Sequence, residues 1–265
     1  MSSRLRHYVC GSTTHDPAAL FHGGARGTRT FPSGVFLYED GSGRRVLFDT
    51  GYVTGKWRTG WKGSIYRRLL PPIVADHDDI AVQLIADGID PESITHVVLS
   101  HLHPDHIGGA HRFRDATFVQ SAGQLRSLSA PRLREGILAG LLPAWFDTAD
   151  RLVIDDDGFV PRVMSGHTVR TMDLLGDGSY LVLDLPGHAR GHLGALVAGR
   201  VLLAGDAAWG SDLLHAADHL KPVPRRVQHD VKAYRQTARM LRAIAATGVR
   251  VVCSHDALAE KELLP

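Results

Sequence analysis

Four side chains that can bind a metal lie within six residues of the chain, in the pattern His-x-His-x-Asp-His: His101, His103, Asp105 and His106. Imidazole and carboxylate groups are ligands of borderline metals such as zinc. The apolar residues 97–99 that precede the pattern indicate a buried strand. Along extended backbone the first two histidines point to the same side, and the turn at Pro104 moves the other pair to a second position. The spacing therefore predicts two neighbouring metal ions; the alternative is a solvated loop that caps a helix.

Three later strands also end in a metal-capable residue. The apolar segment 181–185 precedes Pro-Gly-His188, the segment 201–204 precedes Gly-Asp206, and the segment 249–253 precedes Ser-His255. Ligands placed where strands become loops can converge on one edge of a fold. A single histidine after a strand is usually structural, but three such endings beside the 101–106 pattern favour a site. Together they supply five histidines and two aspartates, enough for two ions, a bridging water and an open position.

Asp49 ends a strand just before a glycine turn. A carboxylate at this place could accept a hydrogen bond from a metal-bound histidine. An ordinary turn aspartate is the alternative, and the residues alone do not choose between them.

The elements that must position these residues alternate between strands and helices. Strands are predicted at 5–10, 34–38, 45–48, 95–99, 116–120, 152–154, 169–174, 180–185, 195–197, 201–204 and 249–253, with a hairpin turn at 39–43. Helices are predicted at 78–87, 121–128 and 230–247, the last with one apolar stripe. No linker separates the two similar halves. We therefore expect one domain over residues 1–265, with its core at about 34–258.

Two segments have no clear period. Residues 52–75 mix aromatic and basic side chains, which suits a loop lining a pocket for an amphipathic or anionic molecule; a partly packed surface segment is the alternative. Residues 129–150 are mostly apolar and could form core, a lid over a pocket, or a contact between subunits. A homodimer is one arrangement that both segments allow.

Composition excludes several classes of function. A hydrophobic content of 44% and a charged content of 22% are ordinary for a soluble globular protein. The net charge of +2 is too small to argue for nucleic acid or a membrane surface as a partner. No apolar run could span a bilayer, and residues 1–8 lack the apolar core of a secretion signal. The two cysteines, Cys10 and Cys253, form no disulfide framework, so we expect a cytoplasmic location.

Taken in order, Asp49-Thr50-Gly51, the 101–106 pattern, Pro-Gly-His188, Gly-Asp206 and Ser-His255 resemble the metallo-β-lactamase superfamily of metallohydrolases. The resemblance implies an α/β (α+β) fold, a four-layer αβ/βα sandwich of two mixed sheets flanked by helices, with the metal site on one edge. It assigns His101, His103 and His188 to a first metal and Asp105, His106 and His255 to a second, bridged by Asp206. Two Zn²⁺ ions are expected; relatives use Fe or Mn, and the ligand set does not choose.

The motif 186–192, Pro-Gly-His-Ala-Arg-Gly-His, and the chain length most resemble the N-acyl homoserine lactonase-like group. That group has a substrate-contacting tyrosine three residues after the bridging aspartate. This chain has Trp209 there, whose indole N–H can donate a hydrogen bond but lacks the reach and acidity of a phenol. We expect Trp209 to be a pocket wall. His192 is expected to pack or to support a ligand rather than to bind metal.

The function that these residues predict is a dinuclear metal-dependent hydrolase acting on a small molecule. A hydroxide held between the ions would attack the carbonyl of a lactone or related carboxylic ester. Asp105 is the candidate to pass a proton to the leaving group. The alternatives are a thioesterase or other ester or amide hydrolase, an iron-containing oxidoreductase of the same fold, a nuclease, and a non-enzymatic binding protein. No serine-hydrolase, zincin, phosphate-loop or dinucleotide motif occurs in the sequence.

Overall fold

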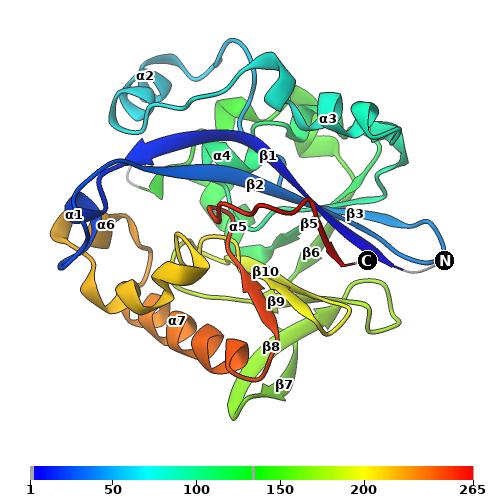
Figure 1. Ribbon diagram of the computed structural model, residues 1–265. Coiled ribbons are helices and arrows are strands. Elements are labelled where there is room, and N and C mark those ends of the chain that lie inside the picture. The colour runs from blue at the N-terminus through cyan, green and yellow to red at the C-terminus, as the bar shows by residue number, and fades with distance from the viewer. Residues whose placement is uncertain (1–2, 133–134, 265) are drawn as a thin grey trace.

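The computed structural model describes residues 3–132 and 135–264 of the chain. Two mixed β-sheets lie between outer layers of helices (Figure 1). The first sheet has the strand order β13-β1-β2-β3-β4-β5-β6, and the second has the order β12-β11-β10-β9-β8-β7. This arrangement confirms the predicted four-layer αβ/βα sandwich.

The first sheet is antiparallel at one end and parallel at the other. Pairing is antiparallel from β13 through β1 and β2 to β3, and parallel from β3 through β4 and β5 to β6. Its strands are β1 (Arg4–His15), β2 (Arg29–Glu39), β3 (Arg45–Phe48), β4 (His96–Val98), β5 (Thr117–Ser121), β6 (Arg151–Ile154) and β13 (Glu262–Leu264). The parallel strands all end at the same edge, which is where the histidine-rich segment begins.

The second sheet is antiparallel except where β11 pairs with β12. Its strands are β7 (Val160–Met164), β8 (His167–Asp173), β9 (Tyr180–Asp184), β10 (Leu193–Val197), β11 (Val201–Leu203) and β12 (Arg250–Val252). Strand β9 shows how the sheet buries both faces. Tyr180 and Val182 point into the core between the sheets, whereas Leu181 and Leu183 point toward the outer helices.

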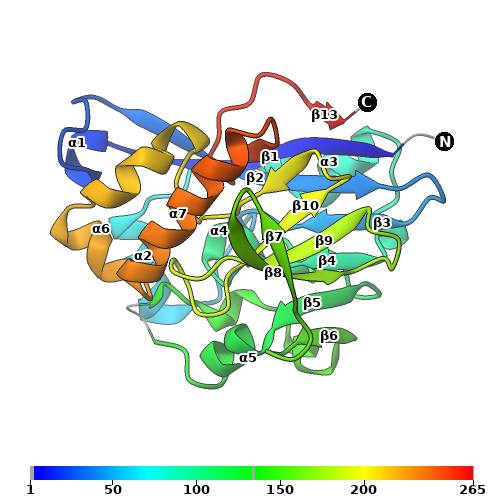
Figure 2. The same cartoon turned by 90° about the horizontal axis from the view of Figure 1, so that it is seen from below.

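The described residues form seven α-helices, several of which cover the outer faces of the sheets (Figure 2). They are α1 (Pro17–Leu20), α2 (Gly60–Leu69), α3 (Ile80–Ala86), α4 (Pro104–Ile107), α5 (Ala122–Ser129), α6 (Pro222–Val227) and α7 (Val231–Ala245) within the described residues. Helix α7 begins where expected because the Asp230 side chain accepts hydrogen bonds from the backbone N–H groups of Lys232 and Ala233. Its buried stripe packs on the second sheet. Across the described residues, every helix is too short or too polar to cross a membrane.

Some elements differ from the sequence prediction. Strand β1 runs to His15 rather than ending at residue 10, and β2 begins at Arg29 rather than residue 34. The added residues pair with one another beyond a bulge between Val9 and Ser12, where Gly11 has a φ of 94°. These polar residues carry no alternating pattern, so partner pairing rather than local sequence makes them strand. Strands β7 and β13 and helices α2 and α6 were likewise not predicted.

The two segments without a clear period pack partly into the core. Trp57 and Tyr66 from the first lie against Ile137, Leu138 and Leu141 from the second, in the cluster beneath α2 and α3. The opposite face of α2 is exposed, with 64% of Trp61 and 71% of Leu69 accessible to solvent. Both segments therefore contribute to the core, and α2 also presents apolar side chains to solvent.

Candidate metal centre

Seven side chains gather at the edge of the sandwich where β4, β9, β11 and β12 end. They form two groups, and within each group one ligand atom from every residue lies within 4.8 Å of the others. The first group is His101, His103, His188 and Asp206; the second is Asp105, His106 and His255. These are the seven residues that the sequence proposed as metal ligands.

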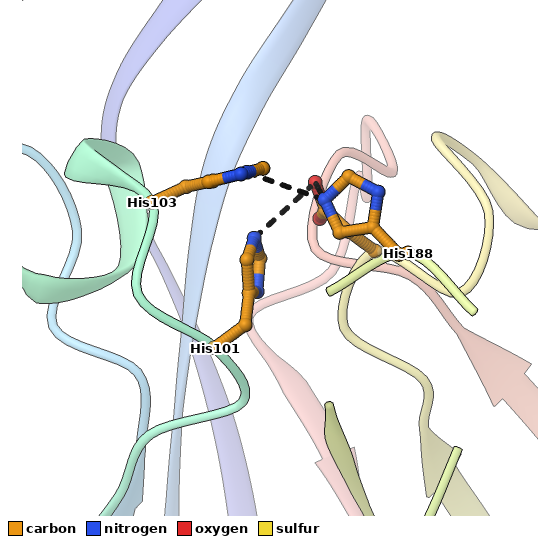
Figure 3. A group of neighbouring side chains, drawn as sticks. His101, His103 and His188 are labelled. Carbon is orange, nitrogen blue, oxygen red and sulfur yellow. Dashed lines mark hydrogen bonds and ion pairs between the residues drawn. The ribbon is translucent and has the colours of Figure 1, made fainter. Parts of the chain in front are cut away.

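The first group brings together distant parts of the chain. His101 and His103 extend from the loop after β4, and His188 approaches them from the other side (Figure 3). The His188 Nε2 atom lies 3.2 Å from His103 Nδ1. The two groups separate at the expected turn at Pro104. Asp105 and His106 follow this turn in α4 and belong to the second group.

Asp206 lies between the two groups. Its Oδ2 atom is 3.2 Å from His255 Nε2, 3.4 Å from His188 Nε2 and 3.9 Å from His101 Nε2. Its Oδ1 atom is 3.4 Å from His106 Nε2. One carboxylate therefore faces histidines of both groups, which is the geometry that a bridging ligand requires.

Each of the five histidines uses its second ring nitrogen to contact a hydrogen-bond acceptor. A metal-binding histidine needs this contact to fix its tautomer and ring orientation. The contacts are His101 Nδ1 to Ser100 Oγ (3.0 Å), His103 Nε2 to the Glu135 carbonyl (2.8 Å), His106 Nδ1 to Asp49 Oδ2 (2.7 Å), His188 Nδ1 to Gln228 Oε1 (2.9 Å) and His255 Nδ1 to the Pro32 carbonyl (2.7 Å). With these nitrogens protonated, all five lone pairs converge on the centre.

The chemistry of the centre fits a bound cation. Burial lowers the pKa of His101 well below its usual value and that of His103 to about 4, so both rings are neutral and able to coordinate. His101 Nε2, His106 Nε2 and Asp206 Oδ1 are buried without a hydrogen-bond partner among the described residues. Buried polar atoms are rarely left unpaired. Neutral imidazole and carboxylate oxygen are also the donors that zinc accepts, so the residues present fit two divalent ions.

Asp49 is fully buried and holds the histidine-rich loop in place. Its Oδ1 atom accepts a hydrogen bond from the Ser100 backbone N–H, and its Oδ2 atom accepts from the Ser100 hydroxyl and from His106 Nδ1–H, each at 2.7 Å. The residue has a φ of 63°, an unusual conformation for a residue with a side chain. It thus contacts the centre through His106 instead of lying in a surface turn.

The two remaining residues singled out from the sequence line the centre without joining either group. His192 is buried, and its Nε2 atom accepts a hydrogen bond from the Asp206 backbone N–H at 3.0 Å. Trp209 stands edge-on to His188 with 6.4 Å between ring centroids, and it contacts Phe21 on its other side. His192 therefore supports Asp206, and Trp209 packs between His188 and Phe21.

Several supporting groups could not be found from the sequence. The carbonyls of Pro32 and Glu135 belong to backbone, which carries no residue-type signal. Gln228 lies 40 residues from the histidine that it contacts. Gly136 gives no signal in the sequence beyond being a glycine. In the structure it leaves room for His103, because a Cβ at this position would lie 2.7 Å from the His103 ring.

Replacing Gln228 with leucine should weaken the first metal site. Leucine has a similar size but cannot accept the His188 Nδ1–H bond, so the ring loses its fixed tautomer. We expect metal affinity to fall by about 10- to 100-fold, as is typical of such supporting residues. Competition with a fluorescent zinc chelator measures it, and Gln228→Glu, which keeps an acceptor oxygen, is the matched control. Equal affinities in all three proteins would contradict this role.

Comparison with known proteins agrees with this geometry. Residues 28–247 match the family described as the metallo-beta-lactamase superfamily. N-acyl homoserine lactonase AttM of Rhizobium johnstonii is 30% identical over 234 residues, which cover 86% of this chain and 79% of that protein. The fold resembles a solved N-acyl homoserine lactone hydrolase holding N-hexanoyl-L-homoserine at its catalytic metal centre, with a TM-score of 0.72, 18% identity and coverage of 97% and 95%. It also resembles AidC, a dizinc quorum-quenching lactonase, with a TM-score of 0.54, 16% identity and coverage of 88% and 75%. This chain belongs to the metallo-beta-lactamase superfamily and is a hydrolase.

Proposed function

We propose that this hydrolase uses water to open a lactone or to cleave a related carboxylic ester of a small molecule. The observation that carries the proposal is the pair of ligand groups on either side of the shared Asp206 carboxylate. Lactonases among the related proteins, whose solved structures hold small-molecule products, support the same class of substrate.

The residues of the first group would hold one divalent cation and those of the second group another, with Asp206 between them. We propose zinc for both, supported by the imidazole and carboxylate donors of the two groups and by the dizinc content of a structural neighbour; iron and manganese are the alternatives. When bound, the ions supply a water of lowered pKa and polarise the substrate carbonyl. The remaining chemistry belongs to side chains of the chain itself.

We propose Asp105 as the residue that moves the proton. Its Oδ2 atom lies 3.5 Å from His106 Nε2 and 3.7 Å from His255 Nε2, the other two members of the second group. The Ser33 hydroxyl donates to the Asp105 backbone carbonyl at 2.6 Å and holds this turn. As water adds to the carbonyl carbon, Asp105 accepts its proton; as the carbon–oxygen bond breaks, Asp105 gives the proton to the leaving oxygen.

The substrate would enter beside the first group. A cavity of about 170 Å³ is bordered there by His103 and His188. Trp209 stands edge-on to His188, at the position in the sequence where the lactonase-like group has a tyrosine. Without that phenol, the carbonyl oxygen has one fewer donor from the chain, so substrates other than homoserine lactones should be included in any test.

A screen of lactones, esters and thioesters of varied chain length tests the function. We expect the metal-loaded protein to hydrolyse at least one lactone or ester and to lose this activity in His101→Ala, which lacks a ligand of the first group. Metal content measured on the same samples by mass spectrometry identifies the ions. The proposal fails if every substrate is hydrolysed equally by both proteins; thioester cleavage alone would point to a thioesterase, and oxygen uptake with bound iron to an oxidoreductase.

Other expectations remain proposals. A reducing compartment such as the cytoplasm is supported by Cys10 and Cys253, which are both free and buried. One domain over residues 1–265 is supported by the shared core between the two sheets. We propose that, if a homodimer forms, the exposed apolar face of α2 is its interface. The mass of the protein in solution, measured by light scattering, shows whether a dimer forms.

A further inference from the structure

The cavity beside the metal centre is lined by cations as well as by ligands. His103 and His188 of the first group line it, together with the apolar residues Leu102 and Ile137. Arg190 and Arg226 also line it, with Glu135 as the one carboxylate among the described lining residues. A group bound against the two arginines would therefore lie beside the centre.

A second, open groove continues from this cavity. His229 borders both, and the groove then runs along the end of α6 and the first turns of α7. In Figure 1 these two helices adjoin at the same end of the molecule. The groove is lined by Arg225, Lys232, Arg235 and Arg239, with Asp230 as its one carboxylate.

Positive charge is concentrated on this face. The cavity and the groove together present six arginine or lysine side chains and two carboxylates, in a chain whose net charge is only +2. Asp230 is engaged in capping α7 through its side chain. Two of the groove's cations are already paired with another carboxylate, because Asp218 lies 2.7 Å from Arg239 and 3.8 Å from Arg235.

The other cations of this face have no such partner. Within the described part of the chain, Arg190, Arg225 and Arg226 form no ion pair, and each is exposed. Guanidinium groups at a concave surface bind phosphate and carboxylate through paired hydrogen bonds. Uncompensated charge beside an active-site cavity also raises the local concentration of anionic substrates.

We propose that the cavity and this basic groove bind an anionic group, a phosphate or a carboxylate, which the substrate carries beyond its scissile bond. The inference rests on the proposed function and narrows its substrate class. Arg190 and Arg226 are the specificity-determining residues, because they line the cavity that also contains His103 and His188. The cations of the groove extend the site for a longer or more highly charged substrate.

Two pairs of substrates test the proposal, and in each pair only one member is an anion. Hexanoyl coenzyme A and hexanoyl N-acetylcysteamine share a thioester, but only the first carries phosphates. The mono-nitrophenyl ester of glutarate and nitrophenyl pentanoate share an acyl length, but only the first carries a carboxylate. We expect the anionic member of at least one pair to have a kcat/KM about 10-fold higher or more, and the favoured pair identifies the anion.

Variants locate the effect. Arg226→Ala and Arg190→Ala should each raise KM for the favoured anionic substrate by about 2- to 5-fold, as loss of one exposed ion pair does, with kcat unchanged and the neutral substrate unaffected. Arg162→Ala removes the same charge from the exposed strand β7, which lies apart from α6 in both views (Figures 1 and 2), and should change neither. The proposal would be overturned if wild type had the same kcat/KM for both members of each pair. It would also be overturned if the arginine variants lost as much kcat/KM with the neutral substrate as with the charged one.

A direct binding measurement tests the anion site without relying on the proposed hydrolytic activity. Glutarate and adenosine bisphosphate are titrated by calorimetry into metal-loaded wild type, Arg226→Ala and Arg162→Ala. We expect one of them to bind wild type and Arg162→Ala, and to bind Arg226→Ala several-fold more weakly. This result would support the site even if no ester were hydrolysed. Absence of binding for both anions would overturn it even if neutral esters were hydrolysed.

Discussion

Replacing Asp206 with asparagine should lower kcat/KM by about 10³-fold or more, because it removes the charge that we propose the two metal ions share. Asparagine keeps the size of the side chain and leaves the backbone N–H free to donate to His192. It keeps only one oxygen, whereas both oxygens of Asp206 face histidines of the centre. We therefore expect at most one tightly bound metal per chain in Asp206→Asn, measured by mass spectrometry alongside the hydrolysis assay.

A matched variant shows whether charge alone explains the loss. Asp156→Asn makes the same chemical change at an exposed site that pairs with Arg170, and it should leave metal content and kcat/KM unchanged. Circular dichroism checks that both variants fold. If Asp206→Asn kept two metals and activity within about threefold of wild type, a bridging role would be ruled out. Even the loss of a residue that only supports a ligand lowers metal affinity or activity by more than threefold.

The sequence identifies the candidate metal ligands more completely than the surrounding fold, because all seven side chains that it selects lie together in two groups. Metal binding needs particular side chains, so the 101–106 pattern and the strand-ending residues His188, Asp206 and His255 could be identified without coordinates. Their division into two groups followed from the turn at Pro104 and from the family resemblance. The contacts that hold the histidines were out of reach where they come from backbone carbonyls, which every residue possesses.

The missed elements share a physical cause. The second half of β1 and the start of β2 are polar and become strand only because they pair with each other. Strand β7 is mostly exposed at the edge of its sheet and has no buried face to impose alternation. Helix α2 presents apolar residues on its exposed side as well as its buried side, so its sequence lacks a single stripe. Partner contacts determine such segments, and a single sequence does not contain those contacts in readable form.

Two substitutions of Asp49 should distinguish its contribution to folding from its contribution to metal binding. Replacing it with alanine leaves the Ser100 backbone N–H, the Ser100 hydroxyl and His106 Nδ1–H buried without their acceptor. We expect the free energy of unfolding of the metal-free protein to fall by about 3 kcal/mol, the scale for breaking a buried charged hydrogen-bond network. Urea denaturation in the presence of a chelator measures this loss.

Asparagine at the same position should act differently. Asn tolerates the positive φ of 63° at this residue, and its oxygen can still accept the Ser100 N–H bond. Its amide must then donate toward His106 Nδ1, which moves the proton of that ring to Nε2, the atom that faces Asp206 at 3.4 Å. We expect Asp49→Asn to stay within about 1 kcal/mol of wild-type stability while losing the second metal, because a protonated Nε2 cannot coordinate. Metal content and urea denaturation of both variants test the separation. If Asp49→Asn bound two metals as tightly as wild type, Asp49 would serve folding alone.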